Sequence, residues 1–310
     1  MNTTTSTSQT WEFAVDELPR LFLQAHQGDI HLRHSGGPGQ VEVTVSTDVA
    51  VDFQGVETRT DGRDVRVVIP ALLNPEGRGF ALQLGSLSIG AGNTVRSRID
   101  VLVPPDADLE LQVGGGNVTV EGRSGTLRVR TGGGDVRFDE AGTVQVRTGG
   151  GDVSAVRAVE GRLDTGGGDI RLESLGEGSI STGGGDVSVR TFGPGRISTG
   201  GGDIRVQSTE GDVTLHTGGG DVNLDGCRGR SEVTTGAGDV RIGVLAGQLN
   251  VRTGAGDISI TVPPEVPVWQ DLSSPLGAVV SRIAGRGEPV EGQEHVEVVA
   301  RTGTGDITLA

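Results

Sequence analysis

The sequence predicts an all-β protein built as a single-chain parallel β-helix (β-solenoid), with coils of 17–18 residues and irregular capping β segments at both ends. Three observations predict it. A glycine-rich hexapeptide, intact at Thr131–Val136, recurs at a nearly constant step; apolar and polar residues alternate between its copies; and 55 glycines occur beside only 3% aromatic residues. Collagen would need glycine at every third position and a disordered chain would lack the alternation, which leaves stacked β coils.

The repeat is marked by an aspartate that closes a run of glycines. Counted from Asn117, a degenerate first copy, the markers are spaced by 18, 17, 17, 17, 17, 18, 18 and 18 residues as far as Asp257. Ala237, Ala255 and Thr304 replace the middle glycine of three copies, so this position is not expected to need a positive φ. The markers after Asn117 are Asp135, Asp152, Asp169, Asp186, Asp203, Asp221, Asp239, Asp257 and Asp306.

Apolar side chains at every second position define the predicted core. Each coil contains two short strands, such as 135–138 and 143–147, joined by a turn at 139–142. Each buried aliphatic side chain contributes roughly 1.5–3 kcal/mol, whereas ordering each backbone residue costs about 1–2 kcal/mol, so a coil with three or four such side chains must stack on its neighbours. The residues expected to face inward are Val136, Phe138, Val144, Val146, Val153, Leu163, Ile170, Leu172, Ile180, Val187, Val189, Ile197, Ile204, Val206, Val213, Leu215, Val222, Leu224, Val240, Ile242, Leu249, Val251, Ile258 and Ile260.

The alternation also places the residues of the glycine corner. Continued forward from Val129 it puts Thr131 inside, and continued backward from Val136 it puts Asp135 outside. The threonines are therefore expected to form an inward ladder and the aspartates an outward one. Stacked carboxylates repel one another, and the expected compensation is hydrogen bonds from the glycine turn of the same coil together with nearby arginines. These arginines lie two residues after every second aspartate, at Arg137, Arg171, Arg205 and Arg241.

The chain divides into four predicted regions. Residues 1–10 are expected to be a disordered tail, 11–113 an irregular N-terminal β region that caps the solenoid, 114–262 the regular solenoid, and 263–310 a C-terminal excursion, cap and last coil. A separate small domain over 11–113 is the alternative. Caps are expected because an open sheet edge would template aggregation. Strands of the first region are predicted at Trp11–Val15, Leu21–Ala25, Asp29–Arg33, Val41–Ser46, Asp64–Ile69 and Arg98–Val103.

The charge balance restricts the partners and the location. All 26 basic residues are arginine and the net charge is −15, which argues against nucleic acid as a partner. The single cysteine, Cys227, excludes an intramolecular disulfide framework. Residues 1–10 contain no apolar segment, and no run of 18 apolar residues occurs. We therefore expect no membrane insertion and a cytoplasmic location, the cell surface being reached only by an unrecognised route or as part of a longer chain.

No catalytic, cofactor-binding or metal-binding residue is predicted. The glycine-rich turns lack the lysine and the helix of a phosphate-binding loop. Weak Ca²⁺ binding by the aspartates remains an alternative, although calcium β-rolls carry their glycine-aspartate motif twice in each coil of about 18 residues. His31 and His34 are expected on opposite faces of a strand, which disfavours a zinc site, and Cys227 is interpreted as a small turn residue rather than a nucleophile.

The repeat Val-x-Thr-Gly-x-Gly-Asp-Val/Ile-x-Val, with Val103–Leu109 before it and Thr302–Ile307 near the end, resembles the bacterial putative-adhesin family of β-strand-repeat domains of unknown function. The similarity covers most of residues 20–310. The resemblance implies a β-helix and a non-enzymatic role, and some relatives are linked to envelope stress.

We therefore expect an adhesin-like binding or scaffold module whose flat solenoid faces contact a protein or a component of the cell envelope. A cytoplasmic polymer-forming scaffold similar to bactofilins, which would self-associate, is the first alternative. A polysaccharide-active β-helix enzyme and a Ca²⁺-binding β-roll are the others. Two tryptophans and six phenylalanines leave few rings for sugar stacking, which disfavours the enzyme.

Overall fold

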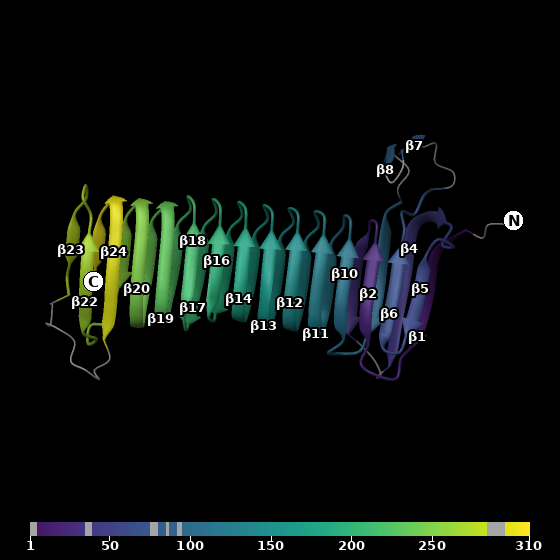
Figure 1. Cartoon of the computed structure of the whole chain (residues 1–310), viewed down its shortest axis with the longest axis horizontal. Helices are drawn as coiled ribbons and strands as arrows, with labels where there is room; N and C mark the ends of the chain where they lie inside the picture. The colour runs from purple at the N-terminus through teal and green to yellow at the C-terminus, as the bar shows by residue number, and fades with distance from the viewer. Residues whose placement is uncertain (1–4, 35–38, 75–79, 85–86, 92–94, 284–294) are drawn as a thin grey trace. The chain divides into compact units, whose positions relative to one another are not determined.

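All regular elements of the residues that the structure describes are β-strands, which confirms the predicted class. The computed structural model describes residues 5–34, 39–74, 80–84, 87–91, 95–283 and 295–310. The chain divides into unit 1, Met1–Gly150, and unit 2, Gly151–Ala310. Their strands are labelled in Figure 1.

In unit 2 each regular coil pairs in parallel with the next at an offset of 17 or 18 residues in sequence. Val153 pairs with Ile170, and 17 residues separate these coils, whereas Val222 pairs with Val240 at an offset of 18. Figure 1 shows these strands side by side. The regular coils are formed by β13 (Val153–Thr165), β14 (Ile170–Thr182), β15 (Val187–Phe192) with β16 (Gly195–Thr199), β17 (Ile204–Glu210) with β18 (Val213–Thr217), β19 (Val222–Ala237) and β20 (Val240–Ala255).

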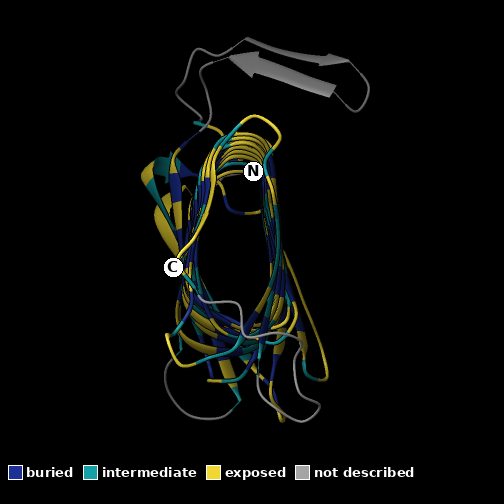
Figure 2. Cartoon of the chain, turned by 90° about the vertical axis from the view of Figure 1, so that its left-hand side faces the viewer, coloured by how far each residue is buried: buried dark blue, intermediate teal, exposed yellow. Residues whose placement is uncertain are grey.

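The core follows the predicted alternation. Every residue that was expected to face inward is buried, and Phe138 and Leu163 have no exposed surface. Figure 2 shows these buried positions along the two walls of the coils, with exposed residues at the corner between the walls. Parallel pairing brings each inward side chain onto its equivalent in the neighbouring coil, so the apolar rows are continuous within each unit.

The second predicted turn of the coil is wrong. β12 (Val136–Thr148) runs through 139–142 as one bent strand, and Ala141 points into the core there. The spacing of three residues from Phe138 to Ala141 breaks the period of two, and the alternation therefore missed this inward row. Its buried members in unit 2 are Ala158, Leu175, Phe192, Thr209, Cys227 and Val244.

Unit 1 contains regular coils and, beside them, strands from the start of the chain. β10 (Asp108–Val113) pairs in parallel with β11 (Val118–Thr131), and β11 pairs with β12. On the other side of β10 lies β2 (Arg20–Ala25), while β3 (Asp29–His34) pairs with β11, so β2 and β3 form a further coil. The Gly28–Asp29 sequence lies at the corner of that coil, where Asp29 Oδ1 accepts the N–H of Asn117 in the following coil at 2.8 Å.

Beyond the β2–β3 coil lie strands that come later in the sequence. β6 (Asp64–Ile69) pairs with β2, and β9 (Ser97–Val103) pairs with β3. Antiparallel strands follow: β4 (Gln40–Val51) on β9, β1 (Ser6–Ala14) on β4, and β5 (Glu57–Asp61) on β6, while β7 (Phe80–Leu84) and β8 (Leu87–Ala91) form a separate hairpin.

The expectation of a disordered tail over 1–10 is wrong for residues 6–10. These residues form the first half of β1, which pairs with β4. The hydroxyl groups of Thr10 and Thr44 lie 2.8 Å apart and those of Ser8 and Ser46 lie 3.3 Å apart. A row of small hydroxyl residues is compatible with a solvent-exposed edge strand, because each cross-strand pair can form a hydrogen bond.

At the end of unit 2 the order of the strands in space also differs from their order in the sequence. β24 (Val296–Thr304) stacks on β20, and β25 (Ile307–Leu309) stacks on β21 (Ile258–Thr261). The outermost strands come earlier in the sequence: β22 (Val268–Ser273) pairs with β24, and β23 (Val279–Ser281) pairs with β25.

Candidate functional site

The glycine corners are held by a ladder of buried threonine hydroxyls. The Thr199 Oγ1 hydroxyl donates to the carbonyl oxygen of Gly185 in the preceding coil at 2.9 Å and accepts from the N–H of Gly202 in its own corner at 3.1 Å. Thr182 and Thr217 make the same two bonds. The predicted inward threonine ladder is therefore confirmed, with the backbone and not other hydroxyls as its partner.

The aspartates form a second ladder with a different pattern from the one expected. The Oδ1 atom of each aspartate accepts the backbone N–H of the aspartate in the following coil, as Asp186 does from Asp203 at 2.9 Å. The expected donors were glycine N–H groups of the same coil. In unit 2 this bond recurs at 2.8–3.0 Å along the series Asp152, Asp169, Asp186, Asp203, Asp221, Asp239, Asp257 and Asp306.

One arginine serves two carboxylates of this aspartate ladder. Arg171 lies 2.7 Å from Asp169 and 3.9 Å from Asp152, and Arg205 repeats the pattern at 2.7 and 3.6 Å with Asp203 and Asp186. The N–H of Asp186, followed by the Arg171 guanidinium, holds the pKa of Asp169 below its usual range. Each of these two arginines therefore offsets part of the repulsion between two stacked carboxylates.

The first and third positions of each corner need glycine mainly because the backbone of the preceding coil lies very close to them, and less because of their own backbone conformation. A Cβ atom on Gly202 would lie 2.1 Å from the carbonyl oxygen of Gly185, whereas one on the middle residue, Gly201, would meet nothing within 4 Å. The prediction that the middle position does not need a positive φ is confirmed, since Gly201 has none. The glycine corners therefore stabilise the fold, and their threonine hydroxyls and aspartate carboxylates bond to backbone groups of the chain itself.

The remaining residues singled out by the sequence have structural partners. His31 Nε2 lies 3.0 Å from Glu121, whereas His34 bonds to the Pro104 carbonyl and to Ser124. Cys227 is not a turn residue: it is buried in β19, and burial raises the pKa of its thiol. Among the described residues no three His, Cys, Asp or Glu side chains are placed to hold a metal ion. The same residues contain no helix that is long and apolar enough to span a membrane.

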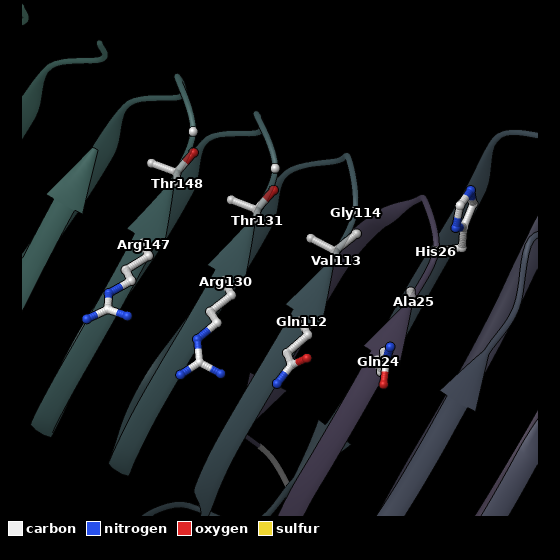
Figure 3. A pocket seen from close by; sticks show the side chains of 12 residues that line it. Gln24, Ala25, His26, Gln112, Val113, Gly114, Arg130, Thr131, Arg147 and Thr148 are labelled. Atoms are coloured by element: carbon white, nitrogen blue, oxygen red, sulfur yellow. The ribbon is translucent and has the colours of Figure 1, made fainter. Parts of the chain in front are cut away.

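A shallow hollow of about 550 Å³ on the outer face of unit 1 has polar side chains that the corners do not use. Figure 3 shows Gln24, Gln112, Arg130 and Arg147 in a row on neighbouring strands, beside the glycine corners. The four residues occupy one register position, on β2, β10, β11 and β12. We call this feature the unit 1 groove. The sequence did not indicate this row, because Gln24 and Gln112 lie in the irregular N-terminal region whereas Arg130 and Arg147 lie in the regular repeat.

The charges around the unit 1 groove differ from those of the aspartate ladder. Arg130 lies 3.8 Å from Glu110, and the Glu110 carboxylate also accepts a 2.8 Å hydrogen bond from the Gln112 amide. Arg130 and Arg147 lie side by side on neighbouring strands, one strand spacing of about 4.8 Å apart. One of these two guanidinium groups, that of Arg130, therefore already has a carboxylate of the neighbouring strand as its partner.

Two further hollows lie in unit 2 and have different linings. One, of about 520 Å³, includes Arg205, which is already held by Asp203 at 2.7 Å, together with Glu173 and Asp225. The other, of about 570 Å³, is lined by Pro263 and Pro264 and by apolar residues of β20.

The family model described as Toastrack DUF4097 matches residues 19–191 and 174–263, which is more than half of the sequence. The chain belongs to the Toastrack DUF4097 family. This membership confirms the resemblance to a β-strand-repeat family of unknown function. In this Toastrack chain the first matched segment contains every residue of the unit 1 groove.

Solved structures with some similarity to this Toastrack chain include two bacterial proteins. A putative adhesin from Bacteroides fragilis is 14% identical, with 98% of this chain and 97% of that chain covered and a TM-score of 0.37. A putative adhesin from Parabacteroides distasonis is 13% identical, with the same coverage and a TM-score of 0.35. At these TM-scores neither similarity supports a conclusion about function. No curated protein matches the chain.

Proposed function

We propose that this Toastrack chain is a non-enzymatic, adhesin-like binding module that holds an extended ligand on the outer face of unit 1. The observation that carries the proposal is the unit 1 groove, which crosses four neighbouring strands at one register position. A shallow groove with polar side chains repeated on neighbouring strands suits a ligand that is itself extended.

The arrangement of the carboxylates supports binding without catalysis. Hydrolysis of a glycosidic bond needs a pair of carboxylates with separate acid and base roles. In the aspartate ladder the Oδ1 atoms accept backbone N–H groups, and Arg171 and Arg205 each neutralise two carboxylates. The hollow itself is lined by glutamine, arginine, histidine, small residues and glycine, a set that has no carboxylate among its described residues.

A binding panel tests this function. The full chain would be applied to immobilised neutral and anionic polysaccharides, phospholipid vesicles and matrix proteins, and each bound ligand would be recovered and weighed by mass spectrometry. We expect binding to at least one member without any change in its mass. A groove variant with Gln24, Gln112, Arg130 and Arg147 all changed to alanine should lose that binding.

The matched control changes residues at the same register position in unit 2. Ser198, His216 and Arg252 lie on β16, β18 and β20, each one residue before the corner threonine. Their triple alanine variant should bind like the unchanged chain. Binding that survives in the groove variant, binding to no member of the panel, or a ligand returned with a cleaved bond would contradict the proposed function.

A further inference from the structure

The outermost strands of unit 2 have open edges. Among the described residues β22 pairs only with β24 and β23 only with β25, so the other edge of each has no strand beside it (Figure 1). The Val296 N–H donates to the Pro267 carbonyl, and in a strand the backbone groups of successive residues point alternately to the two sides. The N–H and carbonyl groups of Val268, Gln270 and Leu272 therefore point away from β24.

Exposed apolar side chains are concentrated at this end of unit 2. Trp269, Leu276, Val279 and Val280 are four of the nine large apolar side chains that are exposed in the described part of the chain. They lie on β22, on β23 and on the connection between these strands. An edge that combines free backbone groups with apolar side chains is a site at which a further strand can pair.

Another outer strand, β5 in unit 1, is protected in a way that β22 is not. Within the described residues β5 pairs only with β6, it is exposed along its whole length, and Glu57, Arg59 and Asp61 give it alternating charges. Charged side chains on an edge strand oppose the addition of a further strand. β22 and β23 together contain one charged residue, Asp271, and its carboxylate is held by Arg301 of β24 at 2.6 Å. The net charge of −15 therefore adds little repulsion at this edge.

The sequence of β22 is complementary to itself when two copies run antiparallel. If Gln270 lies opposite the same residue of a second copy, Val268 lies opposite Leu272. These are the three residues whose backbone groups are free, so each opposed pair can exchange both of its backbone hydrogen bonds. Their side chains lie in the inward rows, since their partners on β24 are buried. This register therefore joins apolar to apolar and amide to amide.

The Gln270 side chain gives a second, independent indication. Its Oε1 atom is buried and has no hydrogen-bond partner among the described residues. A buried polar atom without a partner destabilises a fold, and it is rare in native proteins. A glutamine amide both donates and accepts, so two such amides that face each other across a two-fold axis can bond to one another. A second copy of the chain would thus supply the missing donor.

We propose that β22 is the contact strand of a symmetric dimer, in which two copies of this chain pair antiparallel about a two-fold axis at Gln270. The contact uses the same edge of both copies, so it closes and forms dimers but no filaments. One strand pair with few apolar side chains makes a small interface, and we expect a dissociation constant of roughly micromolar order. This inference goes beyond the proposed function and does not depend on the unit 1 groove.

Sedimentation velocity of the full chain, from micromolar to several hundred micromolar, tests the dimer. The unchanged chain should pass from monomer to dimer, whereas Gln270→Lys should weaken the dimer at least about tenfold because two ammonium groups meet at the axis. Thr60→Lys on β5 is the matched control, since it adds the same charge to another exposed edge strand, and it should dimerise normally. A chain that stays monomeric, species larger than a dimer, or an equal loss in the control would overturn the proposal.

Cysteine cross-linking tests the register without adding charge. Gln270→Cys should form a disulfide between copies under mild oxidation, because directly opposed residues of this kind have Cα atoms about 5.5 Å apart. Ser273→Cys on the same strand is the control, since in this register it lies about 20 Å from its counterpart. The native Cys227 is buried and leaves one accessible thiol in each variant. Equal cross-linking of the two variants, or none in Gln270→Cys, would overturn the proposed pairing.

Discussion

The backbone N–H of Asp203 donates to the side-chain Oδ1 atom of Asp186, one coil earlier, at 2.9 Å. At the corner the Asp186 carboxylate accepts an N–H group of the next coil, as backbone carbonyl groups do along the strands. The following hydrogen bond between these two coils joins two backbone groups, the Val187 N–H and the Asp203 carbonyl. The repeated aspartate is therefore required as a hydrogen-bond acceptor. Its charge is a cost that Arg171 and Arg205 offset.

Substitutions of Asp186 should distinguish the contribution of its hydrogen-bond acceptor to stability from that of its negative charge. Asp186→Asn keeps the Oδ1 acceptor and should be close to neutral, whereas Asp186→Ala leaves the Asp203 N–H without its partner and should cost about 1–2 kcal/mol in the free energy of unfolding. The chain contains a natural precedent, since Asn117 accepts the N–H of Asp135 at 2.9 Å. Urea denaturation measures both variants, and equal destabilisation by Asn and Ala would contradict this account.

The glycines of one corner should differ sharply in their tolerance. Gly201→Ala adds a Cβ atom that meets nothing, and should change the free energy of unfolding by less than about 0.5 kcal/mol. Gly202→Ala places the same atom 2.1 Å from the Gly185 carbonyl oxygen, and should cost about 3 kcal/mol or more because the coils would have to separate.

The two alanine variants are controls for each other, because they make the same chemical change one residue apart. Both can be measured by thermal and urea unfolding on the full chain. A Gly201→Ala variant as unstable as Gly202→Ala would mean that the middle residue needs the conformational freedom of glycine. Ala237 and Ala255, which occupy that position naturally, argue for the opposite result.

Calcium should leave the stability of the chain unchanged. A calcium ion needs several free oxygen ligands at short distance. In the aspartate ladder Oδ1 of Asp169 accepts the N–H of Asp186 and Oδ2 accepts from Arg171, so binding would break both bonds. We expect no shift of the melting temperature at millimolar Ca²⁺ compared with the same concentration of Mg²⁺. A clear rise with Ca²⁺ alone would show that the ladder rearranges to bind it.

Much of the fold could be predicted because one physical rule governs every regular coil. The alternation around Val136 and Phe138 placed the apolar residues, and its continuation placed Thr131 inside. The bend at Ala141 could not be predicted in this way, because the glycine beside it, Gly142, indicates a turn in the sequence although the strand continues through it. Cys227 was misplaced for the same reason.

The partners of side chains were harder to predict than their directions. The sequence indicated that the aspartates point outward and meet arginines, but not that the N–H donor comes from the next coil, since this depends on the register between coils. The unit 1 groove was missed for a related reason. Gln24 and Arg147 lie more than a hundred residues apart, and only the insertion of the β2–β3 coil beside β10 brings them into one row.

A change of pH should reveal the titration of one half-buried histidine, His34. His34 Nδ1 lies 2.9 Å from the Pro104 carbonyl, which can only accept, so Nδ1 carries the proton and the neutral Nε2 accepts from Ser124 at 3.0 Å. Burial lowers the pKa of His34, more than the Pro104 carbonyl and the nearby charges of Asp106 and Asp139 raise it. The folded chain therefore favours the neutral ring.

The sign of the effect on stability follows from linkage. As the pH falls below about 6.5, the unfolded chain binds a proton at this histidine before the folded chain does, so stability decreases until the pH passes the lower pKa of the folded state. His34→Gln should flatten the pH dependence of the free energy of unfolding between pH 7.5 and 5, measured by urea denaturation. His216→Gln, at an exposed position, should keep the slope of the unchanged chain, and a slope that persists in His34→Gln would place the titrating group elsewhere.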